Sequence, residues 1–122
     1  MAQSFEDLTV WQRAMEMTVQ IYALTQGFPD NERYGLTSQI RRAAVSVSSN
    51  IAEGRGRMSQ GEFRQFLGIA QGSNFEVQTQ LEVSRRLRLG SEASLDKAKA
   101  LSIETGKMLS ALIASLQLKA KG

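Results

Sequence analysis

The chain contains no cysteine and no histidine among its 122 residues. Without cysteine it has no disulfide, no thiolate nucleophile and no zinc–thiolate site, and without histidine it lacks the commonest base and metal ligand at neutral pH. Both absences exclude most enzyme classes, and the second excludes di-iron carboxylate sites of the Glu-x-x-His type. The composition therefore predicts a protein that is not an enzyme and that uses no cofactor or metal.

Long apolar runs are also missing. No stretch approaches the roughly 18 consecutive apolar residues that a transmembrane helix requires. The first residues carry acidic side chains early and lack the basic and then apolar regions of a secretory signal. We therefore expect a cytoplasmic protein without a membrane partner.

The charge of the chain is only mildly unbalanced. Fifteen Lys and Arg stand against twelve Asp and Glu, which gives a net charge of +3 and a pI near 9.6. This excess permits an anionic partner without requiring one. A length of 122 residues with 42% hydrophobic residues suits one domain with one core. We expect a single domain over residues 1–122.

Apolar residues recur at three- and four-residue steps along most of the chain, which is the period of an amphipathic helix. Capping serines and turn-forming Pro and Gly residues divide this pattern into segments, and no segment shows the sustained alternation of a strand. The predicted helices cover roughly residues 6–27, 36–54, 60–89 and 92–118. Because the connections are short, successive helices should be antiparallel, and the predicted fold is all-α, an antiparallel up-and-down four-helix bundle.

Two glycines lie four residues apart on one face of the predicted helix 60–89. Gly68 and Gly72 are each expected to destabilise a helix interior by about 1 kcal/mol relative to Ala. The bland interpretation is that they are merely tolerated. The helix over residues 36–54 is rich in small side chains, so we favour close packing of the two helices at Gly68 and Gly72.

A polar strip borders the apolar stripe of the predicted helix 36–54. We predict a hydrogen-bonded polar network there, at the contact with helix 60–89 or at a subunit interface, formed by Arg42, Asn50, Glu53 and Glu76. In this interpretation Arg42 takes part in a structural ion pair. Arg41 is rotated from Arg42 by about 100° around the helix axis, and we expect it to be the freer of the two.

Basic residues gather in two parts of the sequence. Residues 41–64 contain five arginines and two glutamates, and the end of helix 60–89 adds the sequence RRLR. A basic cluster is either a solvated surface or a phosphate-binding surface, and both interpretations stay open here. No set of aromatic residues accompanies these arginines, so any binding should be sequence-tolerant and salt-sensitive. The candidate nucleic-acid-binding residues are Arg41, Arg55, Arg57, Arg64, Arg85, Arg86 and Arg88.

Most aromatic residues fall at helical spacing and are expected in the core or at an interface. Phe75 lies off the apolar stripe of its helix. We expect it to pack against a neighbouring subunit.

Several segments together resemble a known family. They are FEDLTVWQRA (5–14), FPDNERYGLTSQIRRAAVSVSSNIAEGRGR (28–57) and EFRQFLGIAQGSNFEVQTQL (62–81). Over nearly the whole chain the sequence is similar to the four-helix bundle proteins of the 23S rRNA intervening-sequence family, which are encoded within some bacterial 23S rRNA genes. One departure is Ser48, where members of the family often carry proline.

The resemblance implies an antiparallel four-helix bundle that assembles as a homopentameric ring and has no established catalytic residues. Relatives of similar fold include the accessory variability determinant of diversity-generating retroelements, which binds nucleic acid and a reverse transcriptase. The expected partners are therefore further copies of the chain, RNA or DNA, and a reverse transcriptase or another protein. The expected function is that of a non-enzymatic nucleic-acid or ribonucleoprotein accessory factor. The alternative is a protein-binding scaffold with no nucleic-acid role.

Overall fold

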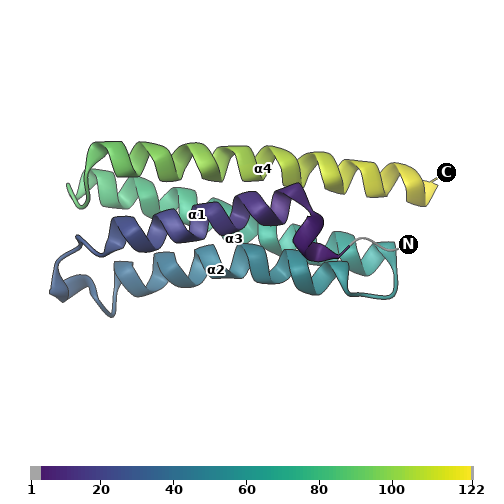
Figure 1. The fold of residues 1–122 in the computed structure, drawn as a ribbon, viewed down its shortest axis with the longest axis horizontal. Coiled ribbons are helices and arrows are strands. Elements are labelled where there is room, and N and C mark those ends of the chain that lie inside the picture. Colours follow the sequence, from purple (N-terminus) through teal and green to yellow (C-terminus); the bar gives the residue numbers. More distant parts are fainter. Residues whose placement is uncertain (1–3, 122) are drawn as a thin grey trace.

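The structure is a computed structural model that describes residues 4–121, with side chains over residues 4–118. It contains only helices in that range, so the all-α prediction is confirmed (Figure 1). Two short 3-10 helices, η1 and η2, precede α1 and α2. In chain order the elements are η1 (Phe5–Asp7), α1 (Thr9–Thr25), η2 (Asp30–Glu32), α2 (Leu36–Arg55), α3 (Gln60–Arg86) and α4 (Glu92–Lys121).

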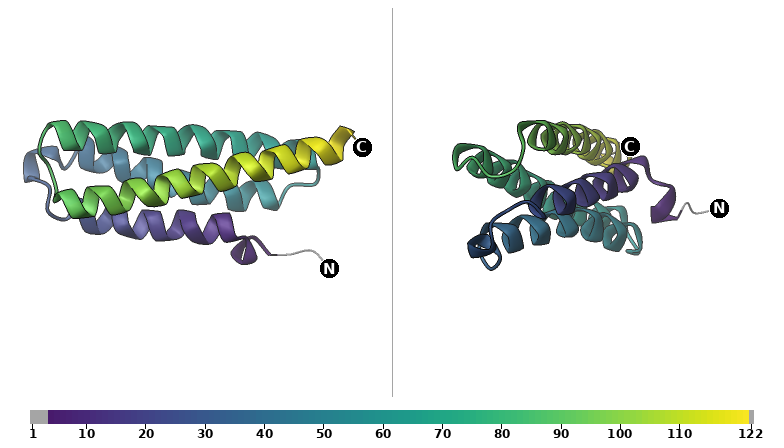
Figure 2. Two further views of the ribbon diagram at one scale, coloured as in Figure 1. Left: turned by 90° about the horizontal axis from the view of Figure 1, so that it is seen from above. Right: turned by 60° about the vertical axis from the view of Figure 1, so that its left-hand side comes forward.

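The helices form an up-and-down bundle in which chain neighbours are also spatial neighbours. α1 and α3 each pack against both α2 and α4, and consecutive helices run in opposite directions (Figures 1 and 2). The connections α1–α2 and α3–α4 lie at one end of the bundle, and the α2–α3 turn lies at the other end. This arrangement confirms the predicted four-helix bundle.

The core consists of one apolar stripe from each helix. Its largest fully buried apolar side chains are Met17 and Ile21 of α1, Ile40, Val47 and Ile51 of α2, Leu67 and Val77 of α3, and Leu95 and Leu109 of α4. Together with the smaller buried residues between them, they follow the three- and four-residue period from which the helices were predicted. None of the described helices has the length and apolar content needed to cross a membrane.

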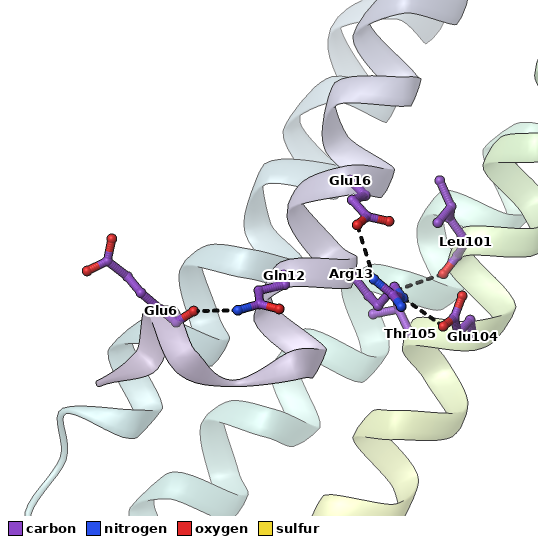
Figure 3. A network of polar contacts seen from close by, with 7 residues as sticks. All are labelled: Glu6, Gln12, Arg13, Glu16, Leu101, Glu104 and Thr105. Atoms are coloured by element: carbon purple, nitrogen blue, oxygen red, sulfur yellow. Dashed lines mark hydrogen bonds and ion pairs between the residues drawn. The ribbon is translucent and has the colours of Figure 1, made fainter. Parts of the chain in front are cut away.

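The first helix begins later than its sequence pattern predicts. Ser4 accepts a hydrogen bond from the Glu6 amide at 3.3 Å and so caps η1, not α1. Leu8 is extended, and α1 begins at Thr9. The Gln12 side chain donates to the Glu6 carbonyl at 3.0 Å and ties η1 to α1 (Figure 3).

The other helix ends follow local capping chemistry. Ser59 accepts from the Glu62 amide at 3.1 Å, and Ser91 accepts from the Ser94 amide at 3.1 Å, as the sequence predicts. α3 ends at Arg86, before the predicted residue 89, because Arg88 (φ 58°) and Gly90 (φ 77°) both adopt left-handed backbone conformations.

Gly54 has a different role from the one that its position near a helix end suggests. It lies buried inside α2, where α3 crosses closely. A Cβ atom at Gly54 would lie 2.6 Å from the Cβ of Phe66 and 3.1 Å from the ring of Phe63. Gly54 is therefore the glycine that permits close packing of α2 and α3.

The prediction of close packing at Gly68 and Gly72 is wrong. Apart from the adjacent residues and the backbone of α3 itself, no described atom lies within 4 Å of a Cβ built on either residue, and both face outward from α3. Leu67, Ala70 and Asn74 form the buried face of α3. Gly68 follows Leu67 and is rotated from it by about 100° around the helix axis, so it points to solvent.

The buried polar contacts lie mainly between α3 and α4. The fully buried Asn74 donates to the Ser102 carbonyl at 2.9 Å, and the Ser102 hydroxyl donates back to Asn74 Oδ1 at 2.8 Å. Gln71 donates to the Gly106 carbonyl at 3.1 Å and contacts the Ser110 hydroxyl at 2.8 Å. The bonds between Asn74 and Ser102 satisfy polar groups that are fully buried, whereas Gln71 Oε1 is buried without a partner in the described structure.

Candidate nucleic-acid interface

The predicted basic residues occupy both ends of the bundle. Arg55, Arg57 and Arg64 lie around the α2–α3 turn, and the other group lies where α3 ends (Figure 1). Their charges differ in availability, because some guanidinium groups already have carboxylate partners. A guanidinium whose charge is offset attracts phosphate less than one without an acidic neighbour.

Two of the three arginines at the end of α3 are paired. Arg85 binds Glu92 and also Asp96, the latter at 2.7 Å, and these contacts join α3 to the start of α4. The hydrogen bond to Asp96 is the main cause of a raised pKa of Arg85. Arg86 binds Glu82 at 3.0 Å, and this hydrogen bond lowers the pKa of the Glu82 carboxyl. Arg88 is exposed and has no ion pair among residues 4–118.

The arginines near the α2–α3 turn show the same division. Arg57 binds Glu53 at 3.2 Å, and its guanidinium carbon lies 4.7 Å from the centre of the Phe66 ring. Arg55 and Arg64 form no ion pair with any side chain that the structure describes.

Arg13 is a basic residue whose guanidinium is occupied by ion pairs within the bundle. Its guanidinium binds Glu104 of α4 at 2.7 Å and Glu16 of its own helix at 3.1 Å (Figure 3). The hydrogen bond to Glu104 is the first cause of a raised pKa of Arg13. With two carboxylates around it, Arg13 serves as a bridge between α1 and α4.

Arg41 is the more firmly held of the pair and Arg42 the freer, which is the reverse of the prediction. Arg41 crosses from α2 to α1, where its Nε donates to Thr25 Oγ1 at 2.7 Å and its guanidinium carbon lies 4.5 Å from the centre of the Tyr22 ring. Arg42 is exposed and forms no ion pair within the described side chains. The prediction that Arg42 takes part in a structural ion pair is therefore wrong within one chain.

The predicted polar network does not form within the chain either. Asn50 donates to the carbonyl and hydroxyl of Ser46 on its own helix, and only the Ser46 hydroxyl reaches α3, at 2.9 Å from Ser73 Oγ. Glu53 is taken by Arg57, and Glu76 accepts from Gln80 at 3.4 Å. The predicted residues bond along their own helices, and the buried α3–α4 contacts take the place of the network.

A pocket of basic and aromatic residues lies at the end of α1, and three of these residues are not among the candidate site residues predicted from the sequence. We define the Tyr–Arg pocket by Tyr22, Arg33, Tyr34, Arg41 and Arg42, which line an open depression of about 390 Å³. The guanidinium carbon of Arg33 lies 5.6 Å from the centre of the Tyr34 ring. The prediction that no aromatic residues accompany the arginines is wrong here, because antiparallel packing of α1 on α2 brings Tyr22 to Arg41.

A second surface feature is a groove between α3 and α4. We define the α3–α4 groove by Gly68, Gln71, Phe75, Gln78, Ile103, Gly106 and Ile113, which line depressions along the two helices. Arg64 and Lys107 also line these depressions. The Phe75 side chain is 56% exposed there, although it is a large apolar residue. Among the described residues, no group of three or more His, Cys, Asp and Glu side chains is placed to hold a metal ion.

Comparisons with known proteins agree with this architecture. No curated protein matches the chain. A crystal structure of a protein of unknown function from the S23 ribosomal protein family of Bacteroides thetaiotaomicron is similar in fold, with a TM-score of 0.79 and 24% sequence identity. The similarity covers 86% of this chain and 95% of that one. Residues 6–111 match the 23S rRNA-intervening sequence proteins, and the chain therefore belongs to that family.

Proposed function

We propose that this chain is a non-enzymatic, homo-oligomeric accessory factor that binds nucleic acid through sequence-tolerant contacts to phosphates. The observation on which this proposal depends is that Arg33, Arg42, Arg55, Arg64 and Arg88 have no carboxylate partner within the described side chains. An arginine without an acidic neighbour releases counterions when it contacts a phosphate, and that release favours binding at low salt.

The positions of these arginines are consistent with a nucleic-acid strand that runs along the surface of the bundle. Unpaired arginines lie at both ends of the bundle, and they come from α2, α3 and the connections between helices. In an oligomer each basic site would recur once per subunit, so the attraction to a polyanion would grow with the number of subunits. The natural partner would then be an RNA, a DNA or a ribonucleoprotein that contains a reverse transcriptase.

The test is the salt dependence of binding to a labelled 20-nucleotide RNA, measured by fluorescence anisotropy. Each phosphate contact with a single strand adds about 0.7 to the slope of log K against log salt. For three contacts, a fourfold rise in salt should weaken binding about 20-fold. Polyglutamate of similar charge is the control for indiscriminate anion binding. Absence of RNA and DNA binding at low salt would contradict the proposal.

The alternative function is a protein-binding scaffold, and the α3–α4 groove is the observation that favours it. Phe75 and Ile103 expose apolar surface in this groove, and the space above Gly68 is open. Apolar surface of this kind marks sites of protein contact. In the main proposal this groove binds another copy of the chain, whereas in the alternative it binds a different protein. A purified chain that stayed monomeric and bound no RNA would favour the scaffold.

A further inference from the structure

The Tyr–Arg pocket combines three cations with two aromatic rings in one depression. Arg33, Arg41 and Arg42 line it together with Tyr22 and Tyr34, and none of the acidic side chains that the structure describes belongs to the lining. Its volume of about 390 Å³ falls within the range of about 300–1,000 Å³ that is common for ligand sites. The lining therefore suits a ligand with both a negative charge and a flat apolar surface.

Arg41 provides a cation whose position is set before any ligand arrives. It donates to Thr25 Oγ1 at 2.7 Å and to the Tyr22 carbonyl at 3.4 Å, so it is held by neutral acceptors of α1. Because these partners carry no charge, they orient the guanidinium without neutralising it. The Tyr22 ring also holds the guanidinium in this position through a cation–π contact.

Glu32, the acidic residue next to Arg33 in the sequence, forms a hydrogen bond to the backbone. Glu32 Oε1 accepts a hydrogen bond from the Leu36 amide at 3.3 Å, at the start of α2. Glu32 and Asp30 lie in η2 and do not line the pocket. The acids of this segment therefore reduce the local potential less than a direct ion pair with Arg41 or Arg42 would.

Tyr34 presents an aromatic surface outside the core. Its side chain is 88% exposed, and Arg33 lies against the ring with the guanidinium carbon 5.6 Å from the ring centre. A tyrosine that contributes nothing to the core and is held by an arginine resembles the stacking platforms of single-strand-binding proteins. A base within a duplex cannot reach such a ring, because both of its faces are stacked on neighbouring bases.

We propose that the Tyr–Arg pocket binds one unpaired nucleotide of a single-stranded nucleic acid. Its base stacks on Tyr34, and its phosphates contact Arg41 and Arg42. This inference rests on the proposed function and adds a preference for single strands, which phosphate contacts alone would not create. The same chemistry is present in a free mononucleotide, so the experiment includes that ligand.

The experiment compares a labelled 12-nucleotide single strand with a duplex of the same length at low salt, by fluorescence anisotropy. Tyr34→Ala should weaken single-strand binding by at least about fivefold and leave duplex binding unchanged, because one base–aromatic stack is lost. Tyr34→Phe should bind like the parent, since it keeps the ring. Circular dichroism verifies the fold of each variant.

A second pair of variants separates the phosphate contact from net charge. Arg42→Gln should weaken binding of both single strand and duplex. Arg86→Gln removes the same charge from a residue already paired with Glu82, and it should have a smaller effect. Equal effects of the two substitutions would overturn the assignment of phosphates to this pocket.

The outcomes distinguish the two proposals. If the parent binds no nucleic acid, the proposed function fails. If the parent binds but Tyr34→Ala binds single strands equally well, the proposed function survives and the nucleotide site is overturned. Binding of free AMP as tight as that of the strand, or of polyglutamate as tight as that of the strand, would also overturn the assignment to a single strand.

Discussion

At the scale of single residues, the interior depends on one reciprocal pair of hydrogen bonds. Asn74 and Ser102 are fully buried and bond to each other across α3 and α4. A buried polar group that loses its partner destabilises a fold more than the mean hydrogen bond stabilises it. The pair therefore fixes the register of α3 against α4, whereas apolar side chains alone would allow some sliding.

Asn74→Ala should lower the free energy of unfolding by about 1–3 kcal/mol, because the Ser102 hydroxyl is left without its acceptor. Asn50→Ala is the matched control. Asn50 bonds only to Ser46 on its own helix, and the higher helix propensity of alanine offsets the lost bond. Urea denaturation of both variants measures the difference. Equal destabilisation by the two substitutions would contradict this account.

The glycines of α2 and α3 should respond to substitution with opposite signs. Gly54→Ala introduces a Cβ 2.6 Å from the Cβ of Phe66, an atom that cannot move without the α3 backbone. We expect a loss of about 1–3 kcal/mol from overpacking. Gly68→Ala meets open space in the single chain and should gain about 0.5–1 kcal/mol from helix propensity. Thermal unfolding of the two variants would refute this expectation if both shifts had the same sign.

At the scale of the elements, the sequence predicts the helices well and their exact ends less well. Apolar spacing locates all four helices, because each buries one stripe. The predicted start of α1 is too early because Ser4 caps a separate 3-10 helix. The predicted end of α3 is too late because Arg88, which is not a glycine, adopts φ 58°. Gly54 resembles a helix terminator in sequence, and only the position of Phe66 on α3 shows its packing role.

The candidate site was less predictable than the fold, because whether an arginine has a carboxylate partner depends on residues from other helices. Arg85 is paired with Asp96 and Arg13 with Glu104, and both partners lie on α4. Arg41 lies beside Tyr22 only because α1 and α2 are antiparallel neighbours. The sequence identified most of the arginines involved, but it could not show which of them remain without a carboxylate partner.

The Arg86–Glu82 pair of α3 predicts that the stability of the fold depends on pH. The hydrogen bond from Arg86 lowers the pKa of Glu82 below its ordinary value of 4.5. A carboxyl whose pKa is lowered by folding stabilises the folded state above the unfolded pKa, and this contribution is lost as pH falls through the lowered pKa. Titration of Glu82 by NMR should show the lowered pKa in the parent chain.

Arg86→Gln should bring the pKa of Glu82 back towards 4.5, because the main cause of the shift is removed. Arg88→Gln removes the same charge from an exposed arginine that makes no contact with Glu82, and it should leave the titration nearly unchanged. A Glu82 pKa that did not respond to the loss of Arg86 would show that another group sets it.

At the scale of the whole molecule, the bundle presents two kinds of surface with different physical responses. Salt would screen the proposed attraction of the basic ends for nucleic acid, whereas it would not weaken apolar contacts made by the α3–α4 groove. A protein that uses both could keep its assembly over a range of salt in which nucleic acid dissociates. The oligomer and the nucleic-acid complex can therefore be examined separately.

Phe75→Ser should reduce the mass of the assembly without unfolding the chain, because Phe75 is exposed in the α3–α4 groove and contributes little to the core. Light scattering after size exclusion would measure the mass at low and high salt. Leu87→Ser is the matched control, since Leu87 is also 56% exposed but lies beyond α3 and outside the groove. It should leave the mass unchanged.

The parent chain should have a mass of several chains at both salt concentrations, and a family-like ring would correspond to about five. A head-to-tail ring needs two different surfaces that fit each other, so loss of Phe75 from one surface breaks every contact of the ring at once. Dissociation should then be complete, down to single chains. A Phe75→Ser chain that kept the parent mass would assign the subunit contact to another face, and a monomeric parent would remove the homo-oligomer from the proposed function.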